Sequence, residues 1–106
     1  MTTEDAQAAL DHLKGTDEQD AKFKARVEYL KEKKKTVIAW EQSESNEKSQ
    51  AAKEQDAYNS ASFRGWLEDY QGALIDFHTM HNKRLSASLQ IEMWRSINAN
   101  QRTGNI

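Results

Sequence analysis

The stretch FRGWLEDYQGALIDFHTMH, residues 63–81, decides the fold of this 106-residue chain. Apolar and aromatic residues recur in it at alternating steps of four and three, which is the spacing of one face of an α-helix. The pattern drifts onto further apolar residues downstream, so we predict one continuous helix over 61–100. Its seam is expected to contain Phe63, Leu67, Tyr70, Leu74, Phe77, His81, Leu85, Leu89, Met93 and Ile97.

A second long helix is predicted over 16–43, because apolar residues recur there at steps of three and four, interrupted by Lys34. Thr16 is the expected N-cap of this helix, with Gln19 as its reciprocal partner. Upstream, residues 1–15 have the pattern of a short amphipathic arm that ends at Gly15. Residues 44–60 are polar and predict a hinge with a short helix, and residues 101–106 predict a frayed tail.

The composition favours a single all-α domain. The chain has no proline, four glycines and 30% charged residues, and it is rich in good helix formers. It has no cysteine, which excludes disulfides, thiolate metal sites and a cysteine nucleophile and fits a cytoplasmic protein. No apolar run is long enough to span a bilayer, and the first residues lack a signal-peptide pattern, so no membrane partner is expected.

The predicted antiparallel hairpin has more apolar surface than its own seam can bury, because several large side chains fall off the main ridges: Trp40, Trp66, Ile91 and Trp94. A second apolar stripe predicts a homodimer that forms a helical bundle or coiled coil. Gly65 and Gly72 indicate either close approach of another helix or simple tolerance within the helix. The candidate dimer interface consists of Trp40, Trp66, Tyr70, Leu74, Phe77 and Ile91.

Patterns that carry chemistry are weak in this sequence. His78 and His81 lie three residues apart beside Asp76, a spacing that can place two imidazoles near one metal ion, but a third ligand would have to come from a distant residue such as His12. A satisfied surface or core histidine is the favoured interpretation. No phosphate loop, nucleophile elbow or carboxylate pair in a cleft is recognisable, so we expect no enzyme activity, no metal and no cofactor.

Charge points to the C-terminal end of the chain. The net charge is −2, and the basic run KEKKK at 31–35 would spread around a helix and pair with nearby acids. By contrast, the last 25 residues contain four basic side chains and one acid. An aromatic beside a guanidinium can anchor a protein interface or stack on bases, so contact with a protein or with nucleic acid both stay open. The candidate contact residues are Lys83, Arg84, Trp94, Arg95 and Arg102.

The same segment, NKRLSASLQIEMWRSINANQRTGNI at 82–106, resembles the closing segment of a group of small helical proteins encoded by tailed bacteriophages. The resemblance is carried by the basic NKR, the apolar ridge, and WRS followed by an Asn-rich end: Asn82, Lys83, Arg84, Trp94, Arg95, Ser96, Asn98, Asn100, Arg102, Gly104, Asn105 and Ile106. It implies a phage-encoded protein of the host cytoplasm and slightly favours a nucleic-acid-binding or replication protein. It assigns no catalytic or binding residue.

The sequence therefore predicts a non-enzymatic, phage-encoded, homodimeric helical module whose projecting C-terminal end contacts a protein partner. The alternatives are a DNA- or RNA-binding accessory protein of phage replication or recombination, and a small virion or assembly component.

Overall fold

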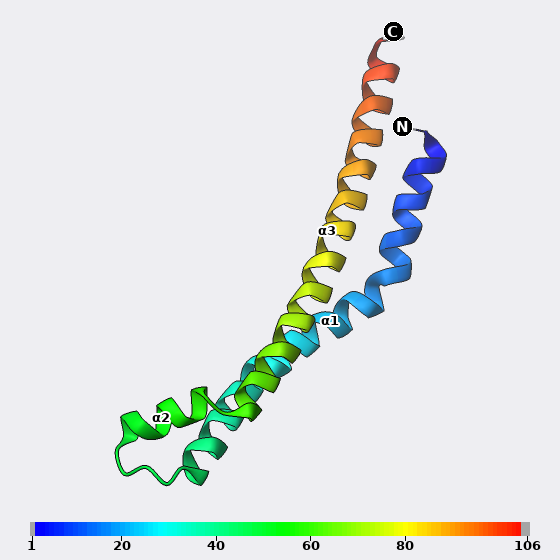
Figure 1. Cartoon of the computed structure of the whole chain (residues 1–106). Coiled ribbons are helices and arrows are strands. Elements are labelled where there is room, and N and C mark those ends of the chain that lie inside the picture. Colours follow the sequence, from blue (N-terminus) through cyan, green and yellow to red (C-terminus); the bar gives the residue numbers. More distant parts are fainter. Residues whose placement is uncertain (1, 105–106) are drawn as a thin grey trace. The chain divides into compact units, whose positions relative to one another are not determined.

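The computed structural model describes residues 2–104 and consists of three helices: α1 (Thr3–Glu44), α2 (Gln50–Tyr58) and α3 (Ala61–Gly104) (Figure 1). Residues 2–104 contain no strand, so the prediction of an all-α chain with a short hinge helix is confirmed. The chain divides into two compact units. The terminal unit comprises Met1–Ala21 and His78–Ile106, and the central unit comprises Lys22–Phe77. None of the helices, over the residues described, has an apolar stretch able to cross a membrane.

A reciprocal cap starts α1 at the second residue. The Asp5 backbone N–H donates to Thr2 Oγ1 at 3.1 Å, and the Thr2 N–H donates to Asp5 Oδ2 at 3.0 Å. These two bonds satisfy two backbone donors at the helix start, as in a capping box with an acid at the third helical position. The predicted cap at Thr16 and Gln19 is therefore wrong, because the N-terminal cap lies fourteen residues earlier in the sequence TTED.

The predicted break at Gly15 is also wrong, because α1 is continuous from Thr3 to Glu44. Gly15 has no positive φ, and its cost inside a helix is only about 1 kcal/mol, less than starting a new helix would cost. Thr16 Oγ1 donates to His12 O at 2.7 Å, a bond of a helix interior and not of a cap. The short N-terminal arm and the second predicted helix are thus one element.

Hydroxyl caps position the hinge within the central unit. Ser49 Oγ accepts from the Ala52 N–H at 3.1 Å and starts α2, and Ser60 Oγ accepts from the Phe63 N–H at 3.1 Å and starts α3. Ser45 Oγ donates to Asp56 Oδ2 at 2.6 Å and holds the connecting loop on α2. The predicted polar hinge over 44–60 is confirmed as a loop and a short helix.

The last helix extends past its predicted end. The predicted end near Asn100 is wrong, because α3 continues to Gly104, so Arg102 lies in a helix and not in a frayed tail. Asn105 and Ile106, the last two residues of the phage-like segment, lie outside the described residues.

The core of the central unit lies between α1 and α3. Val27, Leu30, Trp66 and Ala73 form the buried cluster, and the partly buried residues packed on it are Val37, Phe63, Tyr70, Leu74 and Phe77. The buried row of α3 therefore alternates by three and four through Trp66 and Ala73, whereas the prediction placed it on Leu67. Leu67 is exposed, so the predicted seam is displaced toward one flank.

Trp66 is the largest member of this core and is only 7% exposed. Its indole Nε1–H donates to Leu30 O at 2.7 Å, and its ring stacks on Tyr70 with centroids 5.1 Å apart. Lys34, the single lysine of the predicted α1 seam, places its Nζ 5.6 Å from the Trp66 ring centroid, where the cation is attracted by the ring. The expectation that Trp66 falls off the intramolecular ridge is therefore wrong.

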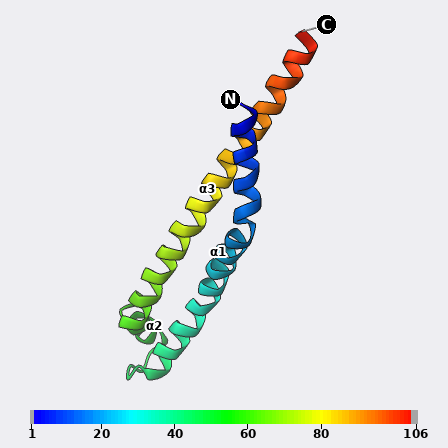
Figure 2. The ribbon, with the colours of Figure 1, turned by 90° about the vertical axis from the view of Figure 1, so that its right-hand side faces the viewer.

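The terminal unit has a different interior. The start of α1 lies beside the C-terminal part of α3 in two views at right angles (Figures 1 and 2). Its buried apolar residues are alanines, Ala6 and Ala9 from α1 and Ala87 from α3, and the charged residue Asp20 of α1 is buried with them. The continuation of the seam through Leu85, Leu89, Met93 and Ile97 is wrong, because all four are exposed.

Candidate interaction surface

A polar layer built on Arg84 joins α3 to α1 in the terminal unit and extends from the buried Asp20 to the exposed Asp17. Its Nη1 donates to Leu13 O and to Thr16 Oγ1, both at 2.8 Å, and its Nη2 donates to Asp17 Oδ1 at 2.7 Å. Its Nε lies 3.8 Å from Asp20 Oδ2. Charged groups between two helices can specify the register in which the helices meet, and we expect this layer to do so. Arg84, predicted as a partner contact, is thus engaged within its own chain.

The other predicted basic residues occupy two different sides of α3. Lys83 lines a groove with Asp5 and His12 of α1, whereas Arg95 and Arg102 line grooves that do not include Lys83. The four cations do not form one face, which weakens the interpretation of this end as a continuous phosphate-binding surface. Arg84, Arg95 and Arg102 lie on one side of the helix by their spacing, but Arg84 is engaged by α1, which leaves Arg95 and Arg102, seven residues apart.

Two neighbouring grooves meet at Trp94. One, about 230 Å³ in volume, is formed by the start of α1 together with Ile91, Trp94 and Arg95. The other, about 430 Å³ in volume, is formed by α3 alone. We call this second groove the terminal groove, and it is lined by Trp94, Arg95, Asn98, Gln101 and Arg102. The sequence prediction of Trp94, Arg95 and Arg102 as contact residues therefore brings together three side chains that do share a concave surface.

A row of exposed apolar side chains follows the outside of α3 in the terminal unit. Leu85, Leu89, Met93 and Ile97 are spaced four apart, so each lies one turn above the last. They are 50%, 52%, 56% and 39% exposed. The least exposed positions on the side facing α1 are the buried Ala87 and the half-buried Arg84, Ile91 and Trp94, which places Leu89 on the far side of the helix from α1. We call these four residues the outer row.

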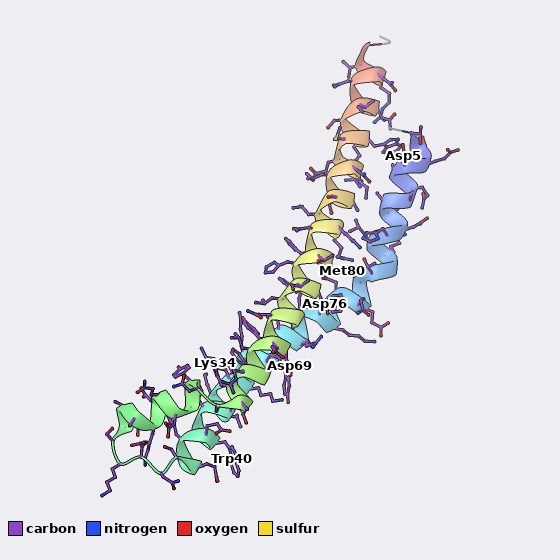
Figure 3. The ribbon with its side chains drawn as sticks, viewed as in Figure 1. Asp5, Lys34, Trp40, Asp69, Asp76 and Met80 are labelled. Atoms are coloured by element: carbon purple, nitrogen blue, oxygen red, sulfur yellow. The ribbon has the colours of Figure 1, made fainter. Side chains whose placement is uncertain are left out.

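The predicted dimer interface is divided by the structure. Trp66, Tyr70, Leu74 and Phe77 pack within the central unit of their own chain, and Ile91 lines the groove at the start of α1. Trp40 alone among the six is largely exposed, at 62%, and its side chain lies on the outside of α1 (Figure 3). The outer row, which the sequence pattern places in the intramolecular seam, is exposed instead.

Titratable groups offer little chemistry. Among residues 2–104 no three His, Cys, Asp or Glu side chains are grouped to hold a metal. His12 Nε2 is buried without a hydrogen-bond partner in the described chain. The backbone hydrogen bond from Thr2, with the Thr2 side chain as second cause, lowers the pKa of the Asp5 carboxyl below its ordinary value of 3.8. That shift belongs to the helix cap, at the end of α1 labelled by Asp5 in Figure 3.

Comparisons of this chain with models of known protein families, with curated proteins and with solved structures find no match.

Proposed function

We propose that this chain is a non-enzymatic, phage-encoded protein–protein interaction module that forms a homodimer through the outer row of α3. The observation that carries the proposal is the exposure of Leu85, Leu89, Met93 and Ile97 along one side of a helix whose other side is already covered. Isolated surface leucines are ordinary, but a contiguous row of four large apolar side chains is typical of an interaction surface.

The charge pattern supports a protein partner for this row. Between Leu85 and Ile97 only Glu92 and Arg95 are charged, in a chain with 30% charged residues. Depletion of charge at the centre and enrichment of large apolar side chains distinguish protein interfaces from the remaining surface. A second copy of the chain has the same uncharged row, and a two-fold axis would bring the outer rows of the two copies together.

The size of the outer row bears on how strong the association can be. A standard protein–protein interface covers about 800 Å² per partner. The outer row itself supplies on the order of 400 Å² per copy, so flanking residues must contribute and we expect a dissociation constant in the micromolar range.

Sedimentation equilibrium from about 1 µM to 1 mM tests the proposal, a range that brackets the expected constant. We expect a monomer–dimer equilibrium in the parent chain and a monomer throughout for Leu89→Lys, with unchanged helical circular dichroism. The matched control is Ile75→Lys, since Ile75 is 65% exposed at the equivalent helical position two heptads earlier, in the central unit. A parent chain that stays monomeric at every concentration, or an Ile75→Lys chain that also loses dimers, would overturn the proposal.

A further inference from the structure

Two of the five arginines of the chain have no partner among the described residues. Arg26 lies 3.6 Å from Asp76, Arg64 donates to Asn59 O, and Arg84 forms the polar layer. Arg95 and Arg102, in contrast, form no hydrogen bond or ion pair within residues 2–104. Both line the terminal groove, and no acidic residue follows Glu92 along α3.

The terminal groove lies on the same side of α3 that α1 covers in the preceding turns. Trp94 and Asn98 follow Ala87 and Ile91 at steps of three and four, and all four are buried or half-buried. Residues of α1 line the groove on one side of Trp94 and are missing from the lining of the terminal groove on the other side. The views in Figures 1 and 2 agree that α3 continues beyond the start of α1.

We infer that the terminal groove binds an acidic amphipathic helix of another protein, which takes the place beside α3 that α1 leaves open. This inference rests on the proposed interaction function and names the class of partner for its second surface. Apolar side chains of the incoming helix pack on the exposed part of Trp94, and polar ones face Asn98 and Gln101. Carboxylates seven residues apart on its flank meet Arg95 and Arg102, because residues at that spacing share one side of a helix.

Charge opposes a symmetric pairing of two terminal grooves. Two copies meeting by their terminal grooves would bring Arg95 and Arg102 against the same two arginines, and like charges placed opposite each other suppress association. The outer row, which has almost no charge, is not subject to this repulsion. The two surfaces of the terminal unit therefore select different partners.

Charge also disfavours nucleic acid as the occupant. Two free guanidiniums neutralise about two phosphates, and affinity for a nucleic acid rises with the number neutralised. The first turn of α1 adds Glu4 and Asp5, which repel phosphates. An acidic helix gains apolar packing on Trp94 as well, and its ion pairs at the exposed rim provide selectivity more than affinity.

Fluorescence anisotropy with two synthetic helical peptides of three heptads each tests this inference. The peptides share their apolar positions and carry either Glu or Lys on the flanks. At low ionic strength, about 20 mM, we expect the Glu peptide to bind about tenfold more tightly than the Lys peptide, and the difference to shrink at about 200 mM. Arg102→Glu should weaken the Glu peptide several-fold and strengthen the Lys peptide, and the same measurement on Leu89→Lys should be unchanged.

Lys83→Glu is the matched control, because it makes the same change in net charge on the other side of α3 and should leave both peptides unaffected. Equal binding of the two peptides, or equal effects of Arg102→Glu and Lys83→Glu, would refute the inference. Tighter binding of a single-stranded oligonucleotide than of the Glu peptide would refute it as well. If neither peptide result is as expected but the chain still forms a concentration-dependent dimer, the inference about the terminal groove is refuted. The proposed function, which rests on the outer row, is then unaffected.

Discussion

Replacing Trp66 with alanine tests the assignment of the intramolecular core. The side chain is 7% exposed, stacks on Tyr70 and donates a hydrogen bond to Leu30 O. Removing a buried tryptophan costs about 3–5 kcal/mol, of which the hydrogen bond supplies about 1 kcal/mol. Trp66→Phe keeps much of the ring and loses the donor, so we expect a cost of about 1–2 kcal/mol. In contrast, Trp40→Ala should cost less than about 0.5 kcal/mol, because Trp40 is 62% exposed.

Thermal unfolding followed by circular dichroism separates these outcomes. Each kcal/mol shifts Tm by about 4–8 °C in a chain of this size, so Trp66→Phe should lower Tm by roughly 5–15 °C and Trp66→Ala by roughly 12–40 °C. The measurement is made at several protein concentrations, since a side chain in a dimer interface makes Tm depend on concentration. Equal losses for Trp40→Ala and Trp66→Ala, both growing on dilution, would refute the intramolecular core and return both tryptophans to an interface between copies.

Three further substitutions examine the helix caps, the glycine in α1 and the polar layer. Arg84→Met should destabilise the terminal unit by about 1–3 kcal/mol, seen as faster hydrogen exchange over 3–21 and unchanged exchange over 27–37. Gly15→Ala should raise the unfolding free energy by about 0.5–1 kcal/mol in chemical denaturation, because an added Cβ meets no atom within 4 Å. The lowered pKa of Asp5 means that its cap is fully present above pH 3.8 and is lost as pH falls through the lower folded value. NMR of the Asp5 amide should follow that loss, and Asp5→Asn should lack it.

The hinge and the helix ends show what the sequence could predict. The polar residues at 44–60 predict a turn of the chain, and α2 lies in this segment. Ser49 caps the start of α2 and Ser60 caps the start of α3. The start of α1 could also be predicted, because Thr2 and Asp5 have the spacing of a capping box. The pattern at Thr16 has a similar spacing and favours the wrong position. The continuation of α1 through Gly15 could not be predicted from the sequence, since a glycine locally favours the end of a helix. Packing within the terminal unit is not visible in the local sequence.

Which face of α3 meets α1 was less predictable. Phe63, Tyr70 and Phe77 belong to both possible rows, and the choice lies between Leu67 and Trp66 beside them. Hydrophobicity favours leucine, but a tryptophan needs a partner for its indole N–H, and the carbonyl of Leu30 supplies one. In the terminal unit the true buried row contains an alanine and an arginine, so an apolar pattern alone points to the wrong side.

Gly65 and Gly72 have two interpretations from the sequence, close approach of another helix or simple tolerance within α3. An added Cβ would meet no atom within 4 Å at either position, so close approach of a helix from the same chain does not explain them. Contact with a second copy there stays a prediction. The exposed side chains at equivalent positions further along α3 include Met93 of the outer row, and the dimer proposed above can be tested without reference to the glycines.

The two units differ in what holds their helices together, and this difference bears on function. The buried cluster of the central unit consists of aromatic and aliphatic side chains, whereas the terminal unit buries alanines around the Arg84 layer. Alanine burial contributes little transfer free energy, so local opening of the terminal unit should require less free energy than opening of the central unit. Both proposed surfaces, the outer row and the terminal groove, lie on that unit. A partner that binds only its closed form would stabilise it by mass action, so partner binding and closure of the terminal unit are expected to be coupled.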